Sequence, residues 1–299
     1  MSNGIGEAVV ADIERFLHET NVSDFCKTPL DRLAREFVST ERAGEQVKEL
    51  SRFVPIGPDT RVLEVGSGFG TFVYHCRVNN ICDCHGLEPG QPPYDATLGI
   101  ARRLLGDAGL DQSVIHEGIG EAMPFEDGSF DAVYSVSCLE HTQDPEAVLA
   151  EVVRVLKPNG VAVLNFPNYG SWWEGHYNTF ILPHTPKALF KLQVRLMGRT
   201  TDFADTLQFI TYGKLRRWLA PLADHVEIVS TGQEIWRERI DRLEFSEWNG
   251  LGTVKRAVRL VKRLKLDRLA VAAGSMLHWE TPFVLVLRRR PHAEPGGSP

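Results

Sequence analysis

The stretch RVLEVGSGFGTF, residues 61–72, decides the fold class of this 299-residue chain. It joins a short apolar run at 62–65 to three glycines within five residues, Gly66, Gly68 and Gly70. Glycines at this spacing let the backbone turn tightly and bring its N–H groups close to a ligand. A buried strand followed by such a turn is typical of the carboxyl edge of a doubly wound sheet.

Alternating strands and helices are predicted to follow this turn. The strand candidates are Arg61–Val65, Asp83–Leu87, Ser113–Glu117, Phe130–Ser135, Val161–Phe166, His225–Thr231 and Pro282–Leu287, and the main helix candidates are Gly70–Asn79, Tyr94–Ala108, Pro145–Leu156 and Thr211–Ala223. The alternation predicts an α/β fold, a Rossmann-like and mostly parallel sheet with helices on both faces.

Composition and charge restrict the function classes. The formal net charge of −6 argues against a surface built for nucleic acid, so no nucleic-acid partner is expected. No apolar run approaches the roughly 20 residues of a spanning helix, and the N-terminus does not resemble a secretion signal. A cytoplasmic location is therefore expected. The five cysteines, an odd number, are interpreted as small, buried, reduced thiols. Cys82 and Cys84 alternate on a predicted strand near Cys76, which makes a metal site an alternative, but C-x-C without a second paired motif is a weak signal.

The glycine turn does not fit the commoner nucleotide motifs. In the dinucleotide pattern G-x-G-x-x-G the third glycine would stand at Thr71, one residue later than Gly70. A P-loop would need a Lys that is absent here. Glu64 would repel a pyrophosphate but could orient a ligand that carries positive charge. Glu88, at the end of the next predicted strand, stands where an acid accepts hydrogen bonds from ribose hydroxyls.

These motifs resemble a known family. LEVGSGFG resembles motif I of the class I S-adenosylmethionine-dependent methyltransferases. GIGEAMPFEDGSFDAVYSVSCLEH and VLAEVVRVLKPNGVAVLNFPN resemble the type 11 methyltransferase subgroup, and the similarity covers roughly residues 58–168. The resemblance implies an S-adenosylmethionine-dependent methyltransferase with S-adenosyl-L-methionine as its cofactor.

The resemblance also implies a set of cofactor-binding residues. They are Glu64, Gly66, Ser67, Gly68, Gly70, Glu88, Pro89, Gly120, Glu121 and Ser135. Ser135 would lie near the methionine amino group, and Gly120 and Glu121 near the adenine. The family often places an Asp against the adenine amino group, where this chain has Ile119.

The chain is predicted to divide into three regions. Residues 1–58 are predicted to be an N-terminal helical extension and 59–290 the methyltransferase domain, followed by a disordered tail at 291–299. Two insertions interrupt the domain, an acceptor-site insertion at 167–210 and a basic helical insertion at 233–280. The basic stretch at 253–270 would suit peripheral contact with the inner membrane face, and also a helix packed on the domain with a solvated basic face.

The acceptor site is expected to involve aromatic and acid–base residues. His141 follows the fourth predicted strand and His176 lies in the insertion, so each is a candidate catalytic base for a hydroxyl acceptor. Tyr169, Trp172, Trp173, Glu174 and Tyr177 are candidate substrate-binding residues. The alternatives are that the histidines orient a loop and that the tryptophans only pack the insertion. E-x-H alone is a weak metal signal, so no metal is expected.

The sequence therefore predicts methylation of a small-molecule, glycan or lipid-linked glycan acceptor, at oxygen. One alternative is methylation of carbon or nitrogen in a quinone-like or natural-product acceptor. The other is a catalytically silent, cofactor-binding interaction module.

Overall fold

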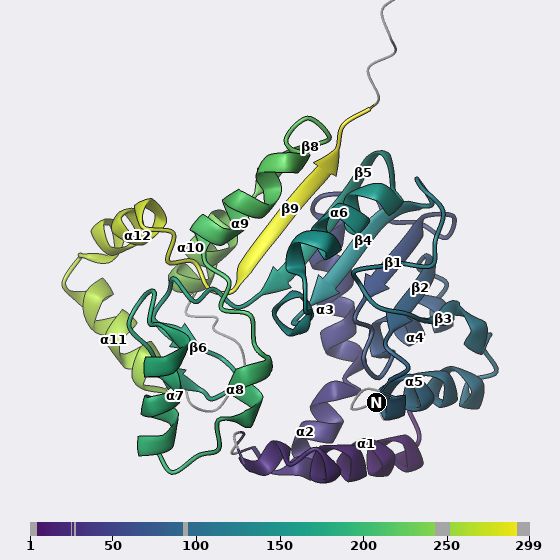
Figure 1. Ribbon diagram of the computed structural model, residues 1–299, viewed down its shortest axis with the longest axis horizontal. Coiled ribbons are helices and arrows are strands. Elements are labelled where there is room, and N and C mark those ends of the chain that lie inside the picture. Colours follow the sequence, from purple (N-terminus) through teal and green to yellow (C-terminus); the bar gives the residue numbers. More distant parts are fainter. Residues whose placement is uncertain (1–4, 25, 27, 92–94, 243–251, 292–299) are drawn as a thin grey trace, which may run out of the picture.

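The computed structural model describes residues 5–24, 26, 28–91, 95–242 and 252–291, and its centre is a seven-stranded sheet (Figure 1). The strands stand in the order β3-β2-β1-β4-β5-β9-β8. Their bounds are Arg61–Val65 (β1), Asp83–Glu88 (β2), Ile115–Glu117 (β3), Phe130–Val136 (β4), Leu156–Phe166 (β5), Val226–Ser230 (β8) and Phe283–Arg289 (β9). Strands β1 to β5 pair in parallel, and β9 runs antiparallel to both β5 and β8. The predicted fold class is confirmed.

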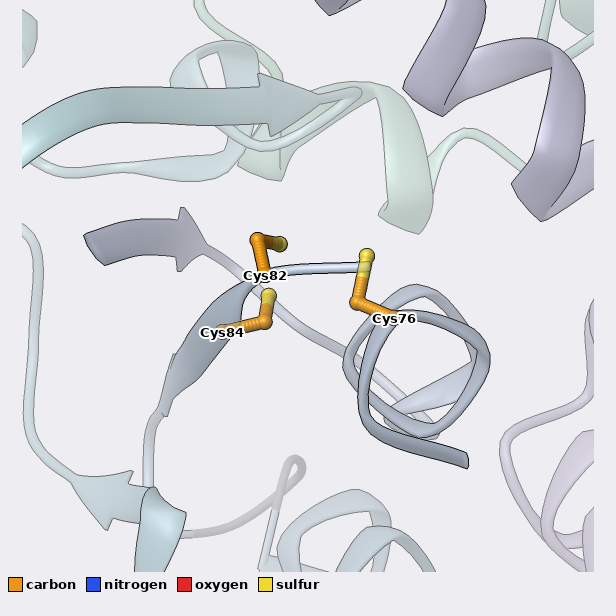
Figure 2. Close-up of side chains that lie close together, drawn as sticks. All are labelled: Cys76, Cys82 and Cys84. Atoms are coloured by element: carbon orange, nitrogen blue, oxygen red, sulfur yellow. The ribbon is translucent and has the colours of Figure 1, made fainter. Parts of the chain in front are cut away.

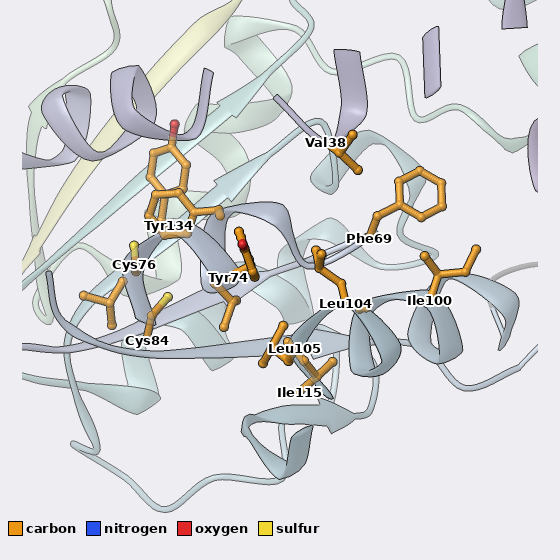
Figure 3. Close-up of a cluster of buried hydrophobic side chains, with 14 of the residues drawn as sticks. Val38, Phe69, Tyr74, Cys76, Cys84, Ile100, Leu104, Leu105, Ile115 and Tyr134 are labelled. Atoms are coloured by element: carbon orange, nitrogen blue, oxygen red, sulfur yellow. The ribbon is translucent and has the colours of Figure 1, made fainter. Parts of the chain in front are cut away.

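Helices cover both faces of the sheet because strand side chains alternate between two hydrophobic cores. Val62 and Tyr134 belong to one core, which α4 (Thr71–Val78) and α5 (Asp95–Asp107) cover. Figure 3 shows Tyr134 in this core with Leu104 of α5. The N-terminal helices cover the same core: α1 (Glu7–Glu19), α2 (Leu30–Phe37) and α3 (Thr40–Ser51). Leu63 and Val133 point to the opposite core, which α6 (Pro145–Val155) and α9 (Tyr212–Leu219) close.

Two predicted boundaries in the core were wrong. Strand β3 begins at Ile115 rather than Ser113, because residues 112–114 form a 3₁₀ turn whose start is capped by Asp111. Strand β5 begins at Leu156, directly after α6, whereas the prediction began it at Val161. Leu156 pairs with Phe130 across an irregularity in the register, so the KPNG stretch bends within a strand.

The segment 167–210 contains regular elements and has its own core. A short hairpin joins β6 (Trp173–Glu174) to β7 (Thr179–Phe180), followed by α7 (Lys187–Leu196) and α8 (Asp202–Thr206). Their shared core consists of Tyr169, Tyr177, Ile181, Phe190, Val194, Ala204, Leu207 and Phe209. This cluster is separate from the two cores of the sheet.

The segment 233–280 contains α10 (Gln233–Arg242), α11 (Gly252–Arg263) and α12 (Asp267–Met276). Figure 1 shows α11 and α12 at the same end of the molecule as β6, α7 and α8. None of the helices in the described part of the chain combines the length and apolar character needed to span a membrane. The predicted disordered tail lies outside the described residues from position 292 onward.

Three cysteines meet within the first core. Cys76 on α4 faces Cys82, which directly precedes β2, and Cys84 on β2, and their sulfur atoms all lie within 4.8 Å of one another (Figure 2). All three side chains are buried, as the sequence predicted. Cys26 is also buried, whereas Cys138 is half-buried.

Candidate functional site

The glycine turn between β1 and α4 requires two of its glycines for close packing. Gly66 has a φ of +73°, and a Cβ there would lie 2.5 Å from Cys138 Sγ. Gly70 has a φ of +76°, and its Cβ would lie 2.9 Å from Ala101 Cβ on α5. A side chain at either position would strain the backbone and collide with a neighbour. The turn therefore holds its backbone close against α5 and the segment that follows β4.

Two buried carboxylates flank this turn. Glu88 accepts hydrogen bonds from the Gly68 N–H at 2.8 Å and the Thr97 hydroxyl at 2.7 Å. Burial raises the pKa of Glu88, although both hydrogen bonds oppose the shift. Burial and the nearby charge of Glu88 raise the pKa of Glu64 well above its ordinary value. Glu64 Oε2 is buried without a hydrogen-bond partner in the described structure, so it can interact with a cationic ligand.

The ten candidate cofactor-binding residues divide into those that line a cavity and those that do not. Most of them line one large cavity: Glu64, Gly66, Ser67, Gly68, Glu88, Pro89, Gly120 and Glu121. Gly70 and Ser135 do not line it, and the Ser135 hydroxyl donates a hydrogen bond to the Val65 carbonyl at 2.7 Å. Glu121 accepts hydrogen bonds from the Gln143 and Asp144 N–H groups, which fixes the loop before α6. The exposed side chain of Ile119 also faces the cavity.

The segment 167–210, the predicted insertion, forms another wall of this cavity. Trp172, Trp173 and His176 line it, and Trp172 packs edge-on against Trp279 at 5.2 Å between ring centroids. The other three candidate substrate residues, Tyr169, Glu174 and Tyr177, are buried beneath this wall and do not line the cavity. Their polar atoms support His176 and the insertion core.

The two candidate bases meet around a carboxylate that the sequence analysis missed. Glu140 and His141 lie in a 3₁₀ turn after β4, and His176 approaches from the insertion. Glu140 Oε1 lies 3.9 Å from His141 Nε2 and 3.7 Å from His176 Nε2. The ring centroids of the two histidines are 5.3 Å apart. Glu140 directly precedes His141 in the sequence, but nothing in its spacing indicated that its side chain would turn inward.

The insertion holds the His176 ring in a fixed orientation. His176 Nδ1 lies 2.7 Å from Glu174 Oε1, which also accepts a hydrogen bond from the Tyr169 hydroxyl at 3.1 Å. Glu174 Oε2 accepts the Tyr177 N–H at 2.7 Å. With Nδ1 donating to Glu174, the other ring nitrogen of His176 faces Glu140.

Burial dominates the electrostatics of this group. It raises the pKa of Glu140 to about 7 and lowers the pKa of His141 to about 3, which makes His141 a weak proton acceptor. Burial also opposes protonation of His176, but the Glu174 carboxylate outweighs this effect and raises the pKa of that imidazole. The same ion pair lowers the pKa of Glu174 despite its burial.

The N-terminal extension also contributes to the cavity, which the sequence analysis did not anticipate. Phe16 on α1, Phe37 at the end of α2 and Arg42 on α3 are among its lining residues, together with Trp236 and Arg239 on α10. These residues come from segments far apart in the sequence, and no local pattern connects them.

Comparisons with known proteins agree on one class of domain. A family model described as a methyltransferase domain matches residues 63–164. Among curated proteins, norajmaline N-methyltransferase of Rauvolfia serpentina is 29% identical over 133 residues, which cover 42% of this chain and 44% of that enzyme. The sterol 24-C-methyltransferase erg6 of Schizosaccharomyces pombe is 25% identical over 269 residues, covering 80% of this chain and 68% of that enzyme.

Solved structures of similar proteins include a putative sarcosine dimethylglycine methyltransferase from Galdieria sulphuraria. It is 18% identical, with a TM-score of 0.49, and the match covers 86% of this chain and 88% of that one. Phosphoethanolamine N-methyltransferase 2 of Haemonchus contortus, solved with S-adenosyl-L-methionine, is 18% identical with a TM-score of 0.46, covering 83% of this chain and 53% of that one. The chain spans less than half the length of several of its curated relatives.

Proposed function

Because residues 63–164 form a class I S-adenosylmethionine-dependent methyltransferase domain, we propose that the whole chain transfers the methyl group of this cofactor to an acceptor hydroxyl. The acceptor is a small molecule or a glycan, free or lipid-linked. Methyl transfer from a sulfonium is an in-line displacement, so the protein has to align donor and acceptor and exclude water.

The observation that carries this proposal is a single cavity of about 2150 Å³. The glycine turn and Glu88 line one part of it, and His141, His176 and the tryptophans of the insertion line another. A cavity of this size exceeds the range usual for one small ligand, so it has room for a cofactor and an acceptor together.

Oxygen as the methylated atom is supported by the polar groups at the insertion. A hydroxyl has to lose its proton during transfer, and a polar cluster helps that loss. His141 and His176 line the cavity together with Trp172 and Trp173, and the fully buried Glu140 lies 3.9 and 3.7 Å from the two imidazoles. An amine that reacts in its neutral form would not need these groups to become nucleophilic.

Methylation at nitrogen or carbon is the second candidate. It is favoured by the curated relatives, whose names describe N-methyltransferases of norajmaline and ajmaline and a sterol C-methyltransferase. Activity on such acceptors, with none on hydroxyl-bearing ones, would select it. Cofactor binding without methyl transfer to any extract component would instead support the alternative of a catalytically silent interaction module that binds the cofactor.

Membrane contact through 253–270 stays a prediction. Leu260, Leu264 and Leu269 are exposed in this stretch beside several basic side chains. An interfacial helix would bury such leucines and place its Lys and Arg residues near anionic headgroups. Co-sedimentation with anionic but not neutral vesicles would support the contact, and absence of binding to both would remove it.

Calorimetry with S-adenosylmethionine tests the cofactor half of the proposal. The wild type should bind, and Glu88→Ala should weaken binding about 10–100-fold, since hydrogen bonds to a charged group contribute about 1.5–3 kcal/mol. Glu227→Gln is the matched control, because Glu227 is an exposed acid on β8 outside the cavity. No binding by the wild type would refute the proposal.

Incubation with labelled cofactor and fractionated extract tests the acceptor half. Mass spectrometry of the labelled product should locate the new methyl group on an oxygen atom. A methyl group on nitrogen or carbon would replace the proposal with its second candidate.

A further inference from the structure

Glu140, His141 and His176 form a group whose spacing fits a shared metal ion. One potential ligand atom from each lies within 4.8 Å of the others. We propose that these three side chains bind one divalent transition-metal cation, which holds the acceptor oxygen during methyl transfer. The role in transfer rests on the proposed function, whereas the cation site itself does not.

The distances from Glu140 to the two imidazoles are too long for direct hydrogen bonds but fit ligands of one shared ion. The Glu140 Oε1 to imidazole distances of 3.7 and 3.9 Å are longer than a hydrogen bond allows. With metal–ligand bonds of about 2.0–2.2 Å, two ligands of one ion stand about 3.4 Å apart in a tetrahedron and at most about 4.2 Å apart. Both Glu140–imidazole separations fall between these limits, and the ligand atoms of the two histidines lie within 4.8 Å of each other.

Burial supplies an independent argument. Glu140 is fully buried, and neither carboxylate oxygen accepts a hydrogen bond from another described residue. A buried carboxylate without partners is costly, and a bound cation is one of the few arrangements that compensates it.

Glu174 acts as the outer partner that metal-binding histidines usually have. Its hydrogen bond to His176 Nδ1 leaves Nε2 of that ring facing Glu140. The Tyr169 hydroxyl and the Tyr177 N–H hold Glu174 in turn. A carboxylate–histidine pair of this kind fixes the tautomer and orientation of the ligand.

The charges also balance. Metal ligation requires an ionised carboxylate and neutral imidazoles. In that state the two fully buried carboxylates, Glu140 and Glu174, carry a net charge of −2. A divalent cation would bring this group to neutrality. One carboxylate and two imidazoles suit Mn²⁺, Fe²⁺, Co²⁺, Ni²⁺ or Zn²⁺ better than Ca²⁺ or Mg²⁺, which prefer oxygen ligands.

The site lies where an acceptor could reach both the ion and the methyl donor. His141 and His176 line the cavity, and Cys138, three residues before His141, packs against Gly66 of the glycine turn. Three protein ligands leave further coordination positions open. An acceptor hydroxyl bound there would lose its proton to solvent more readily. Its oxygen would then bond to the methyl carbon while the carbon–sulfur bond breaks, and the sulfur would keep the electron pair.

Manganese binding tests the site directly, without knowledge of the acceptor. Metal-free wild-type protein is prepared with a chelator and then exchanged into chelator-free buffer. It should bind one equivalent of Mn²⁺, and binding is measured as the loss of the electron paramagnetic resonance signal of the free ion. Glu140→Gln should abolish this binding. Glu174→Gln should weaken it about 10–100-fold, as loss of an outer partner usually does.

Two matched controls separate this site from others. Cys84→Ser disrupts the thiol cluster, which would favour softer ions, and should leave Mn²⁺ binding unchanged. Glu227→Gln removes an exposed acid and should also leave it unchanged. S-adenosylmethionine binding, measured on each variant, shows that the fold is intact, and His176→Asn replaces Glu140→Gln if that variant does not fold.

The outcomes distinguish this inference from the proposed function. Cofactor binding without Mn²⁺ binding by the wild type would overturn the metal site alone, as would Mn²⁺ binding that survives both Glu140→Gln and His176→Asn. If the wild type binds Mn²⁺ but not S-adenosylmethionine, the proposed function is overturned and the metal-site proposal still holds.

Discussion

Binding of S-adenosylmethionine should release a proton, and Glu64 should be its source. Burial and the neighbouring Glu88 raise the pKa of Glu64 well above 4.5, so the ligand-free protein keeps this side chain protonated over a window above that value. The amino group of the cofactor's methionine part carries positive charge, which would favour the ionised carboxylate. Affinity should therefore rise with pH inside this window, by up to tenfold per pH unit.

The substitution Glu64→Gln should change both the pH dependence of ligand-free stability and the affinity for the cofactor, in opposite directions. The unfolded chain releases the Glu64 proton near pH 4.5 and the folded chain only at higher pH, so ligand-free stability falls as pH rises between the two values. The fall is about 1.4 kcal/mol for each pH unit of that window. Glutamine cannot ionise, so the variant should be more stable than wild type at the upper end of the window, and it should bind the cofactor more weakly.

Calorimetry in buffers of different ionisation enthalpy measures the released proton. Wild type should release up to one proton per cofactor bound, and Glu64→Gln none. The nucleoside 5′-methylthioadenosine, which lacks the amino acid part, should bind to wild type without this release. Proton release that persists in Glu64→Gln, or that is equal for the nucleoside, would refute the reasoning.

Three further substitutions test the structure. Gly66→Ala should abolish cofactor binding in calorimetry, because its φ alone costs about 1–2 kcal/mol and its Cβ would collide with Cys138; unchanged binding would contradict the turn described here. Asp144→Ala removes the cap that accepts two N–H groups at the start of α6 and should lower the free energy of urea unfolding by about 1 kcal/mol. Tyr134→Phe removes the hydroxyl that donates to Glu49 at 3.0 Å between β4 and α3, and should cost about 1.5–3 kcal/mol in the same assay, whereas no change would mean that water replaces this contact.

The sequence predicted the sheet well because its signals are local. The run at 61–65 and the glycines after it are neighbours in the chain, so strand β1 and its turn could be recognised directly. The boundary at Leu156 was missed because a helix passes into a strand there without a break, and pairing with Phe130 decides where the strand begins. Boundaries that depend on a partner strand leave little trace in the local pattern.

Part of the candidate site could be predicted from the local sequence, and part depends on contacts that only the folded chain forms. Glu64 and Glu88 stand at strand ends, so their position followed from topology. The meeting of His141 with His176 depends on how the insertion folds back over the sheet, which no local spacing encodes. Glu140 was missed for a related reason, since a charged residue is usually exposed and only the folded structure shows this one fully buried.

The separate core of the segment 167–210 has a consequence for engineering. Phe190, Tyr177 and their neighbours hold this segment together without side chains from the sheet cores. Trp172 and Trp173, which line the cavity, can therefore be varied, or the whole segment replaced, while the strands around the glycine turn keep their packing. Under the proposed function, changes in this segment would alter which acceptor is bound and leave the residues around the glycine turn in place.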